Sequence, residues 1–373
     1  MVFTNHRASI AFAVALLISA CGTTKPNPAP IATNQAASTA TKLDDVSQPT
    51  NTALPEPTLA PAKEGDSRSK PAKMGTELKG KTWSITIENV IRGQEAAQAL
   101  AKANQFNDPA KPGNVFLIAN LTLKNISKEQ KAQSTSFAVN LNVTGDQNIS
   151  YRAIPAVPPE PLKGELFPDG TAKGQVVFEV PASEKNLMFI VTESMSFDTN
   201  LRQFIAIDPD ASITPDPSLR KVAPTDIGRK RDTPAKIGET LVAGQWEFSI
   251  LQTVRDNDAA TLITEANQFN DPAPADQEYV AIRFKARYLG TDDPDRSENI
   301  SGTFLKITGE KNVVYEHLPV VPPKPNIDSM LFAGGSAEGW TVASVSKGEK
   351  GLKLIFEPLF SFGQDNIRFI TIE

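Results

Sequence analysis

The chain has 373 residues, a formal net charge of −5 and a sequence pI near 5.4. This acidic balance leaves no broad basic face to neutralise phosphates, and so it argues against nucleic-acid binding. Apart from a polar N-terminal stretch, the sequence has normal apolar content and fits two domains of about 130 residues each.

The first residues follow the three-part plan of an export signal. Arg7 lies in a short polar head, and an apolar run of about 11 residues follows, well short of the roughly 20 that span a bilayer. Residues 17–21 (LISAC) resemble a bacterial lipobox, in which small residues precede an obligatory cysteine. We therefore expect residues 1–20 to be a signal peptide that is cleaved between Ala20 and Cys21.

Cys21 is the only cysteine, and we expect it to carry the lipid anchor. Two or more acyl chains bind a bilayer firmly, whereas a single chain binds weakly. Acylation of Cys21 leaves no thiol in the mature chain, which excludes disulfides, thiolate catalysis and Cys-ligated metals. Gly22 follows the cysteine where an Asp would be the usual inner-membrane retention signal. We expect an extracytoplasmic protein on the outer membrane or the cell surface.

Residues 21–73 are rich in Pro, Ala and Thr and contain hardly any large apolar side chains. Such a stretch cannot bury enough surface to offset its ordering entropy. It predicts a disordered, partly polyproline-like tether spanning roughly 40 Å.

The rest of the chain contains an internal duplication. Trp83 and Trp246 are 163 residues apart, and so are two copies of ANQFNDP, at 103–109 and 266–272. IPAVPPEP at 154–161 recurs as LPVVPPKP at 318–325, shifted by 164. The spacing predicts one domain at 74–208, a linker at 209–236 and a second domain at 237–373.

Within each copy, apolar residues mostly alternate with polar ones, as in strands with one buried face. Trp83, Ile85 and Ile87 share one face, and the second copy repeats this from Trp246. The pattern predicts an all-β fold of two antiparallel immunoglobulin-like β-sandwiches. Residues 95–103 and 258–266 consist of good helix formers and predict a short helix in each copy. We expect Ala99, Ala103, Phe106 and its counterpart Phe269 to anchor these segments in the core.

Several of these segments resemble a known family. Each copy has a strand after Gly, a polar insertion, Asn-Asp-Pro and a later turn, which is LFPDGTAKG at 166–174 and LFAGGSAEG at 331–339. This order of segments resembles a bacterial extracellular immunoglobulin-like family of unknown function. That family belongs to the superfamily of a secreted mycobacterial immunoprotective antigen. The resemblance implies a β-sandwich in a secreted protein or lipoprotein, and it provides no catalytic residues.

Three motifs could suggest catalysis, and each has a simpler interpretation. His317 is the only histidine of the predicted mature chain, and Ala153 is its counterpart in the first copy. Residues 334–339 (GGSAEG) lack the second Gly of a nucleophile elbow and are typical of a turn before a strand. Residues 67–70 (SRSK) match Ser-x-x-Lys only within the predicted tether. We therefore expect no catalytic site.

Other polar or proline-rich segments could bind ligands. Residues 292–298 (DDPDRSE) could hold calcium, but they lack the Gly and Glu of an EF-hand loop, so a solvated hairpin loop is the simpler interpretation. The Asn-Asp-Pro blocks are good turn formers. Pro158-Pro159 and Pro322-Pro323 fit either stiff crossovers between sheets or docking motifs for a partner. We expect no metal and no cofactor.

The leading hypothesis is a non-enzymatic lipoprotein, anchored to the bilayer through Cys21, whose two domains bind a protein or another envelope component. The alternatives are a structural spacer without a specific ligand and a hydrolase with an unrecognised site. Binding is inferred here by analogy with other immunoglobulin-like folds.

Overall fold

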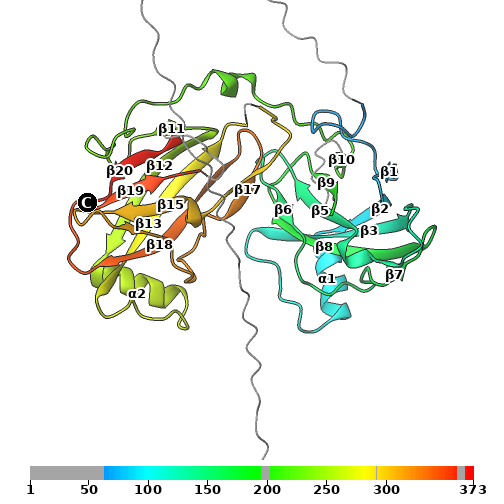
Figure 1. The fold of residues 1–373 in the computed structure, drawn as a ribbon. Helices are drawn as coiled ribbons and strands as arrows, with labels where there is room; N and C mark the ends of the chain where they lie inside the picture. Colours follow the sequence, from blue (N-terminus) through cyan, green and yellow to red (C-terminus); the bar gives the residue numbers. More distant parts are fainter. Residues whose placement is uncertain (1–62, 195–201, 291, 359–365) are drawn as a thin grey trace, which may run out of the picture. The chain divides into compact units, whose positions relative to one another are not determined.

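Each half of the chain folds as an antiparallel β-sandwich with one short helix in the computed structural model (Figure 1), which confirms the predicted fold class. The structure describes residues 63–194, 202–290, 292–358 and 366–373. The predicted signal peptide, Cys21 and most of the predicted tether lie outside the described residues. In the described part, no helix is long and apolar enough to span a membrane.

The first sandwich consists of short and long strands with one helix and one 3-10 turn. They are β1 (Glu77–Lys79), β2 (Trp83–Arg92), α1 (Gln94–Ala103), β3 (Asn114–Asn125), β4 (Gln133–Ser134), η1 (Thr135–Phe137), β5 (Val139–Thr144), β6 (Tyr151–Arg152), β7 (Glu165–Leu166), β8 (Thr171–Pro181), β9 (Met188–Glu193) and β10 (Gln203–Ala206). One sheet has the order β1-β2-β3-β8 and the other β10-β9-β5-β6. The strands β4 and β7 pair separately.

The second sandwich repeats this plan after a 3-10 helix in the linker. Its elements are η3 (Pro217–Lys221), β11 (Leu241–Ala243), β12 (Trp246–Arg255), α2 (Asp256–Ala266), β13 (Gln277–Tyr288), β14 (Glu298–Ile300), η4 (Gly302–Phe304), β15 (Leu305–Thr308), β16 (Val314–Tyr315), β17 (Ser329–Leu331), β18 (Ser336–Ser346), β19 (Lys353–Phe356) and β20 (Arg368–Thr371). Its sheets have the orders β11-β12-β13-β18 and β16-β15-β19-β20, and β14 pairs with β17.

The alternating apolar residues form the core of each sandwich, as predicted. Trp83, Ile85 and Ile87 are buried on one face of β2. Aromatic rings join the two sheets in both copies: the centroids of Phe178 and Phe189 are 5.8 Å apart. Phe248 and Phe356 stack at 3.7 Å. Both cores therefore close through one ring from each sheet.

The two predicted helices are present, but the residues that pack most deeply into the core differ from the predicted ones. Figure 1 shows α1 against the sheet of β3 and β8, and α2 against that of β13 and β18. Ala96 and Leu100 are the buried residues of α1; the predicted anchor Ala99 is half-buried and packs against the same cluster, whereas Ala103 is exposed. A four-residue spacing puts Ala96 and Leu100 on the same face of the helix. This face is rotated about the helix axis from the predicted face of Ala99 and Ala103.

The first sandwich begins earlier than the predicted boundary at residue 74. The backbone N–H of Phe204 donates to the Gly65 carbonyl, and Ala72 exchanges hydrogen bonds with Phe204 and Ala206. Arg68, which we expected in a disordered tether, is fully buried. The sequence GDSRSKPAK is polar, so its apolar content gave no sign that tertiary hydrogen bonds would hold it.

The linker makes the same contact with the second sandwich. Phe369 donates to the Gly228 carbonyl, and Ala235 donates back to Phe369. Gly65 and Gly228 are 163 residues apart, so each repeat includes this N-terminal loop. Within the predicted linker, Ile213 and Leu219 are buried, and much of the segment is therefore packed.

The proline-rich segments run along the edges of the sheets. Ile154 donates to Val177 of β8, and Leu318 donates to Val342 of β18. β8 and β18 are edge strands of their sheets, so each segment covers backbone groups that would otherwise be open to another strand. This position supports a structural role for the prolines.

Candidate ligand pocket

A pocket of about 370 Å³ opens at one end of the second sandwich. We call it the Trp246 pocket. Its lining residues come from the β11–β12 turn, the end of β13, the loop that leads into β14, η4, and the segments flanking 359–365. They are Gly244, Gln245, Trp246, Tyr288, Asp292, Asp293, Arg296, Glu298, Asn299, Phe304, Pro358 and Asn366. Pockets of this size hold small organic molecules.

Three aromatic side chains form the inner wall of the Trp246 pocket. Trp246 opens β12 and pairs in register with Tyr288, the last residue of β13. Their ring centroids lie 5.0 Å apart, and Phe304 approaches Trp246 edge-on at 6.4 Å. All three are buried, and their packing against one another fixes the wall without a ligand.

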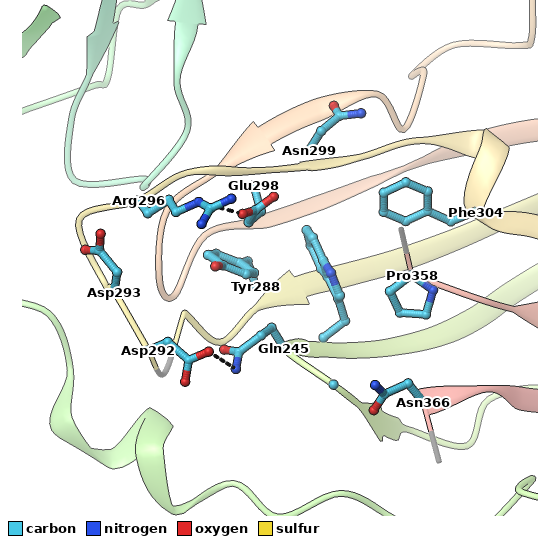
Figure 2. A pocket seen from close by; sticks show the side chains of 12 residues that line it. Gln245, Tyr288, Asp292, Asp293, Arg296, Glu298, Asn299, Phe304, Pro358 and Asn366 are labelled. Carbon is cyan, nitrogen blue, oxygen red and sulfur yellow. Dashed lines mark hydrogen bonds and ion pairs between the residues drawn. The ribbon is translucent and has the colours of Figure 1, made fainter. Parts of the chain in front are cut away.

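Polar side chains form one rim of the pocket (Figure 2). Gln245 donates from its side-chain amide to the Asp292 carboxylate at 3.3 Å. The guanidinium of Arg296 forms an ion pair with Glu298 at 2.9 Å. Figure 2 shows these groups with Tyr288 on one side, and Phe304 and Pro358 on the other. The pocket therefore has a charged end and an apolar end.

The electrostatic environment of Tyr288 reflects the acidic rim. Burial, together with the carboxylates of Glu298, Asp292 and Asp293, raises the pKa of Tyr288 to about 12, and Arg296 partly opposes them. The phenol is therefore neutral at physiological pH. The Tyr288 side chain is therefore an uncharged part of the wall.

The equivalent position in the first sandwich is closed by a glutamate. In the first sandwich Leu141 pairs with Val191, and in the second Leu305 pairs with Phe356. Val191 and Phe356 are therefore equivalent. Two residues after each of them are Glu193 and Pro358, which are equivalent as well. The Glu193 carboxylate accepts hydrogen bonds from the backbone N–H groups of Lys81 and Thr82 at 2.9 and 2.7 Å. Among the described residues, the pocket lined by Trp83 and Glu193 has a volume of only about 10 Å³. Proline cannot make these contacts, and the second copy is open there.

The predicted acidic loop, residues 292–298, contributes to this pocket, but its carboxylates are not arranged around a cation site. Asp293 pairs with Arg202 at 3.1 Å, and Asp295 pairs with the buried Arg68 at 3.0 Å. Among the residues that the structure describes, no group of three or more His, Cys, Asp or Glu side chains could hold a metal ion. Each of these two carboxylates is therefore paired with an arginine.

His317 lies outside the Trp246 pocket. Its Nδ1 is 3.1 Å from the Thr341 hydroxyl, and it bridges Ala343 of β18 as Ala153 bridges Phe178 in the first copy. Burial lowers the pKa of His317, with partial opposition from Asp328. The half-buried ring occupies a strand-end position, in agreement with its structural interpretation.

The other sequence motif resembling a catalytic site forms a turn. Gly334 has a φ of 89°, and β18 begins at Ser336. The hydroxyl of Ser336 therefore lies at the start of an edge strand, as predicted for a turn before a strand.

The duplicated ANQFNDP segments have a structural asparagine and an exposed phenylalanine. Asn107 bonds to the backbone of Leu100 and to both backbone polar groups of Val157, all at 2.9 Å, and Asn270 repeats this with Ile263 and Val321.

The prediction that Phe106 and Phe269 anchor the core is wrong. Their side chains are 81% and 82% exposed. Each follows an Asn whose side chain accepts the Phe backbone N–H, and this local turn directs the ring outward.

Sequence reasoning missed the Trp246 pocket. It placed Trp246 in the core, which is correct, but a largely buried ring can still line a cavity. The available signal was the mismatch between Glu193 and Pro358 in otherwise matched repeats. Its meaning depends on which backbone N–H groups lie nearby, and only the folded chain shows them.

Fold and site together define a β-sandwich protein with a pocket of ligand size in one of two repeated domains. Residues 72–202, most of the first sandwich, match the family described as Domain of unknown function (DUF4352). No curated protein matches the chain.

Solved structures of bacterial proteins are similar to about one domain. The chain is 14% identical to a candidate lipoprotein (ycdA) from Bacillus subtilis, with a TM-score of 0.27, over 36% of this chain and 38% of that one. It is 16% identical to the yjhA protein of Bacillus subtilis, with a TM-score of 0.28, over 37% and 99% of the two chains. An uncharacterised β-sandwich protein from Clostridium difficile 630 gives 14% identity and a TM-score of 0.26, over 40% and 100%.

Proposed function

We propose that this chain is a non-enzymatic, lipid-anchored protein of the cell envelope that binds a small organic ligand in the Trp246 pocket. The observation that carries the proposal is the difference between Glu193 and Pro358. Two repeats share one fold, and one of them fills the end of its sandwich with a hydrogen-bonded carboxylate. The other leaves about 370 Å³ open against three packed aromatic rings.

The chemistry of the pocket supports binding over catalysis. The lining residues that the structure describes include no His, Cys, Ser, Thr or Lys. Glu298 is paired with Arg296, and Asp292 accepts from a neutral amide. A nucleophile beside a general base, which acyl transfer requires, has no counterpart among these groups.

The anchoring part of the proposal rests on the sequence. Cys21 stands at the end of a lipobox-like segment after a short apolar run, and a Pro- and Ala-rich stretch follows it. A tether of this kind would let the second sandwich reach ligands some distance from the bilayer surface. A spacer without a ligand would have no need of an open pocket.

Capture of small molecules tests the proposal. The mature full-length chain with Cys21→Ser would be incubated with a low-molecular-mass extract of the cell envelope, and the retained compounds would be identified by mass spectrometry. Pro358→Glu puts the carboxylate of the first copy into the second pocket. Pro272→Glu makes the same chemical change on the exposed Asn-Asp-Pro segment and is the matched control.

We expect that the protein without a pocket substitution and the Pro272→Glu variant both retain a compound that the Pro358→Glu variant does not retain. Identical profiles for all three proteins would contradict a ligand in the Trp246 pocket.

A further inference from the structure

We infer that the Trp246 pocket selects an organic cation, that is, a small ligand with an ammonium group attached to an apolar body. This inference rests on the proposed function and specifies its ligand class. It follows from the charges of the rim, the aromatic wall and the separation of the two ends of the pocket.

Among the described residues, the pocket lining carries three carboxylates and one guanidinium. The guanidinium of Arg296 is paired with Glu298 at 2.9 Å, and Asp293 is paired with Arg202 at 3.1 Å. Asp292 accepts a hydrogen bond from Gln245 and has no cationic partner among the described residues. One negative charge at the mouth is therefore left to be balanced, and a positively charged ligand can balance it.

The aromatic wall favours the same sign of charge. The face of an aromatic ring is electron-rich and attracts cations, and Trp is the best of the side chains in this role. Trp246 and Tyr288 are packed together with centroids 5.0 Å apart, so a ligand meets two such rings at the inner wall. Tyr288 keeps its proton, because burial and the nearby carboxylates raise the pKa of its hydroxyl. Both rings are neutral in this site.

The opposite side of the pocket suits an apolar group. Figure 2 shows Phe304 and Pro358 on the side of the pocket opposite the acidic loop, and neither brings a charge. A ligand that placed its ammonium group near Asp292 would direct its remaining atoms toward these two residues. About 370 Å³ accommodates a ring or short chain of this kind.

An anionic ligand fits less well. Arg296 is the only cation among the described lining residues, and a carboxylate bound there would compete with Glu298 for its guanidinium. Such a ligand would also lie near Asp292 and Asp293, and like charges in a partly closed pocket repel.

Three probes with the same body test the inference. They are 2-phenylethylammonium, 2-phenylethanol and 3-phenylpropanoate, with charges of +1, 0 and −1 at pH 7. Each would be titrated against the mature full-length chain carrying Cys21→Ser, with binding followed by ligand-observed NMR at a fixed ionic strength. We expect the cation to bind roughly three- to tenfold more tightly than the alcohol, and the anion to bind most weakly.

Two isosteric variants locate the effect. Asp292→Asn removes the unbalanced charge and should reduce the affinity for the cation by about threefold or more while leaving that for the alcohol unchanged. Asp271→Asn removes the same charge near Tyr279, which lies roughly 30 Å along β13 from Tyr288, and should change neither affinity.

Three outcomes would each overturn the charge selectivity. The three probes could bind with equal or reversed affinities, the cation could fail to bind, or Asp292→Asn could leave the affinity for the cation intact. The proposed function would still be judged by the Pro358→Glu capture experiment. Failure of that experiment alone would remove the pocket as the binding site.

Discussion

Glu193 and Pro358 occupy equivalent positions at the ends of two repeated β-sandwiches, and the Glu193 side chain is hydrogen-bonded to the turn opposite it. Its carboxylate accepts from Lys81 and Thr82 and is 9% exposed. A side chain in this position therefore decides whether the sandwich end is sealed or open. This difference between the copies is the basis for assigning a ligand site to the second one.

The first prediction concerns the sealing glutamate. Glu193→Ala removes two charge-assisted hydrogen bonds to the backbone and leaves two N–H groups without that partner. We expect the free energy of unfolding to fall by about 2–4 kcal/mol, measured by urea denaturation.

Glu193→Gln keeps one acceptor oxygen and should lose about half as much. Glu160→Ala, at an exposed position of the same sandwich, should stay within about 0.5 kcal/mol. If Glu193→Ala unfolds at the same urea concentration as Glu160→Ala, the carboxylate does not seal this end.

The second prediction separates the two roles within ANQFNDP. Phe106→Ala should change the free energy of unfolding by less than about 0.5 kcal/mol, because the ring is 81% exposed. Asn107→Ala should cost about 1–3 kcal/mol, because it removes bonds to the backbone of Leu100 and Val157. Thermal and urea unfolding measure both. A larger loss for Phe106→Ala than for Asn107→Ala would restore the core role that the sequence suggested.

The fold was predictable because its signal is periodic. Alternation around Trp83 and Trp246 predicted strands, and the Ala-rich run before ANQFNDP predicted α1. Burial of polar residues was not predictable in the same way. Arg68 lies in a polar stretch, and its burial depends on Asp295, which is 227 residues away.

The exposure of the apolar side chain of Phe106 was equally difficult to predict from the sequence. Phe106 follows the helix at a spacing that suits a core contact, but the Asn104 side chain accepts its backbone N–H and turns the chain outward. Prediction of the Trp246 pocket requires both the alignment of the repeats and the positions of the Lys81 and Thr82 backbone amides. Only the alignment can be obtained from the sequence.

The third prediction concerns pH. Burial holds the pKa of His317 below its ordinary value of 6.5, so the unfolded chain binds more protons than the folded chain at pH values between the two. The contribution of a neutral His317 to stability is present above the unfolded pKa. It is lost as the pH falls through that value toward the folded pKa.

We therefore expect the free energy of unfolding of the unmodified chain to fall, relative to His317→Ala, when the pH is lowered from 7 to 5. Ala is the residue that the first copy has at this position, Ala153, so the variant is a matched replacement. Chemical denaturation at several pH values gives the difference between the two proteins, in which the titration of all other groups cancels. A difference that is constant, or that grows in favour of the unmodified chain on acidification, would show that His317 is not held neutral.

The fourth prediction concerns the anchor. Cys21→Ser removes the thiol that would receive the diacylglycerol, and the described part of the chain offers no helix that could replace it in a bilayer. Each buried methylene of an acyl chain contributes about 0.8 kcal/mol, so loss of the chains should release the protein completely. Fractionation of cells after a high-salt wash measures this, with Ser38→Ala in the same Pro- and Ala-rich stretch as the control. A Cys21→Ser protein that stays with the membranes would mean that the mature chain is held by something other than its lipid, and the proposal of a tethered binding protein would need a different anchor.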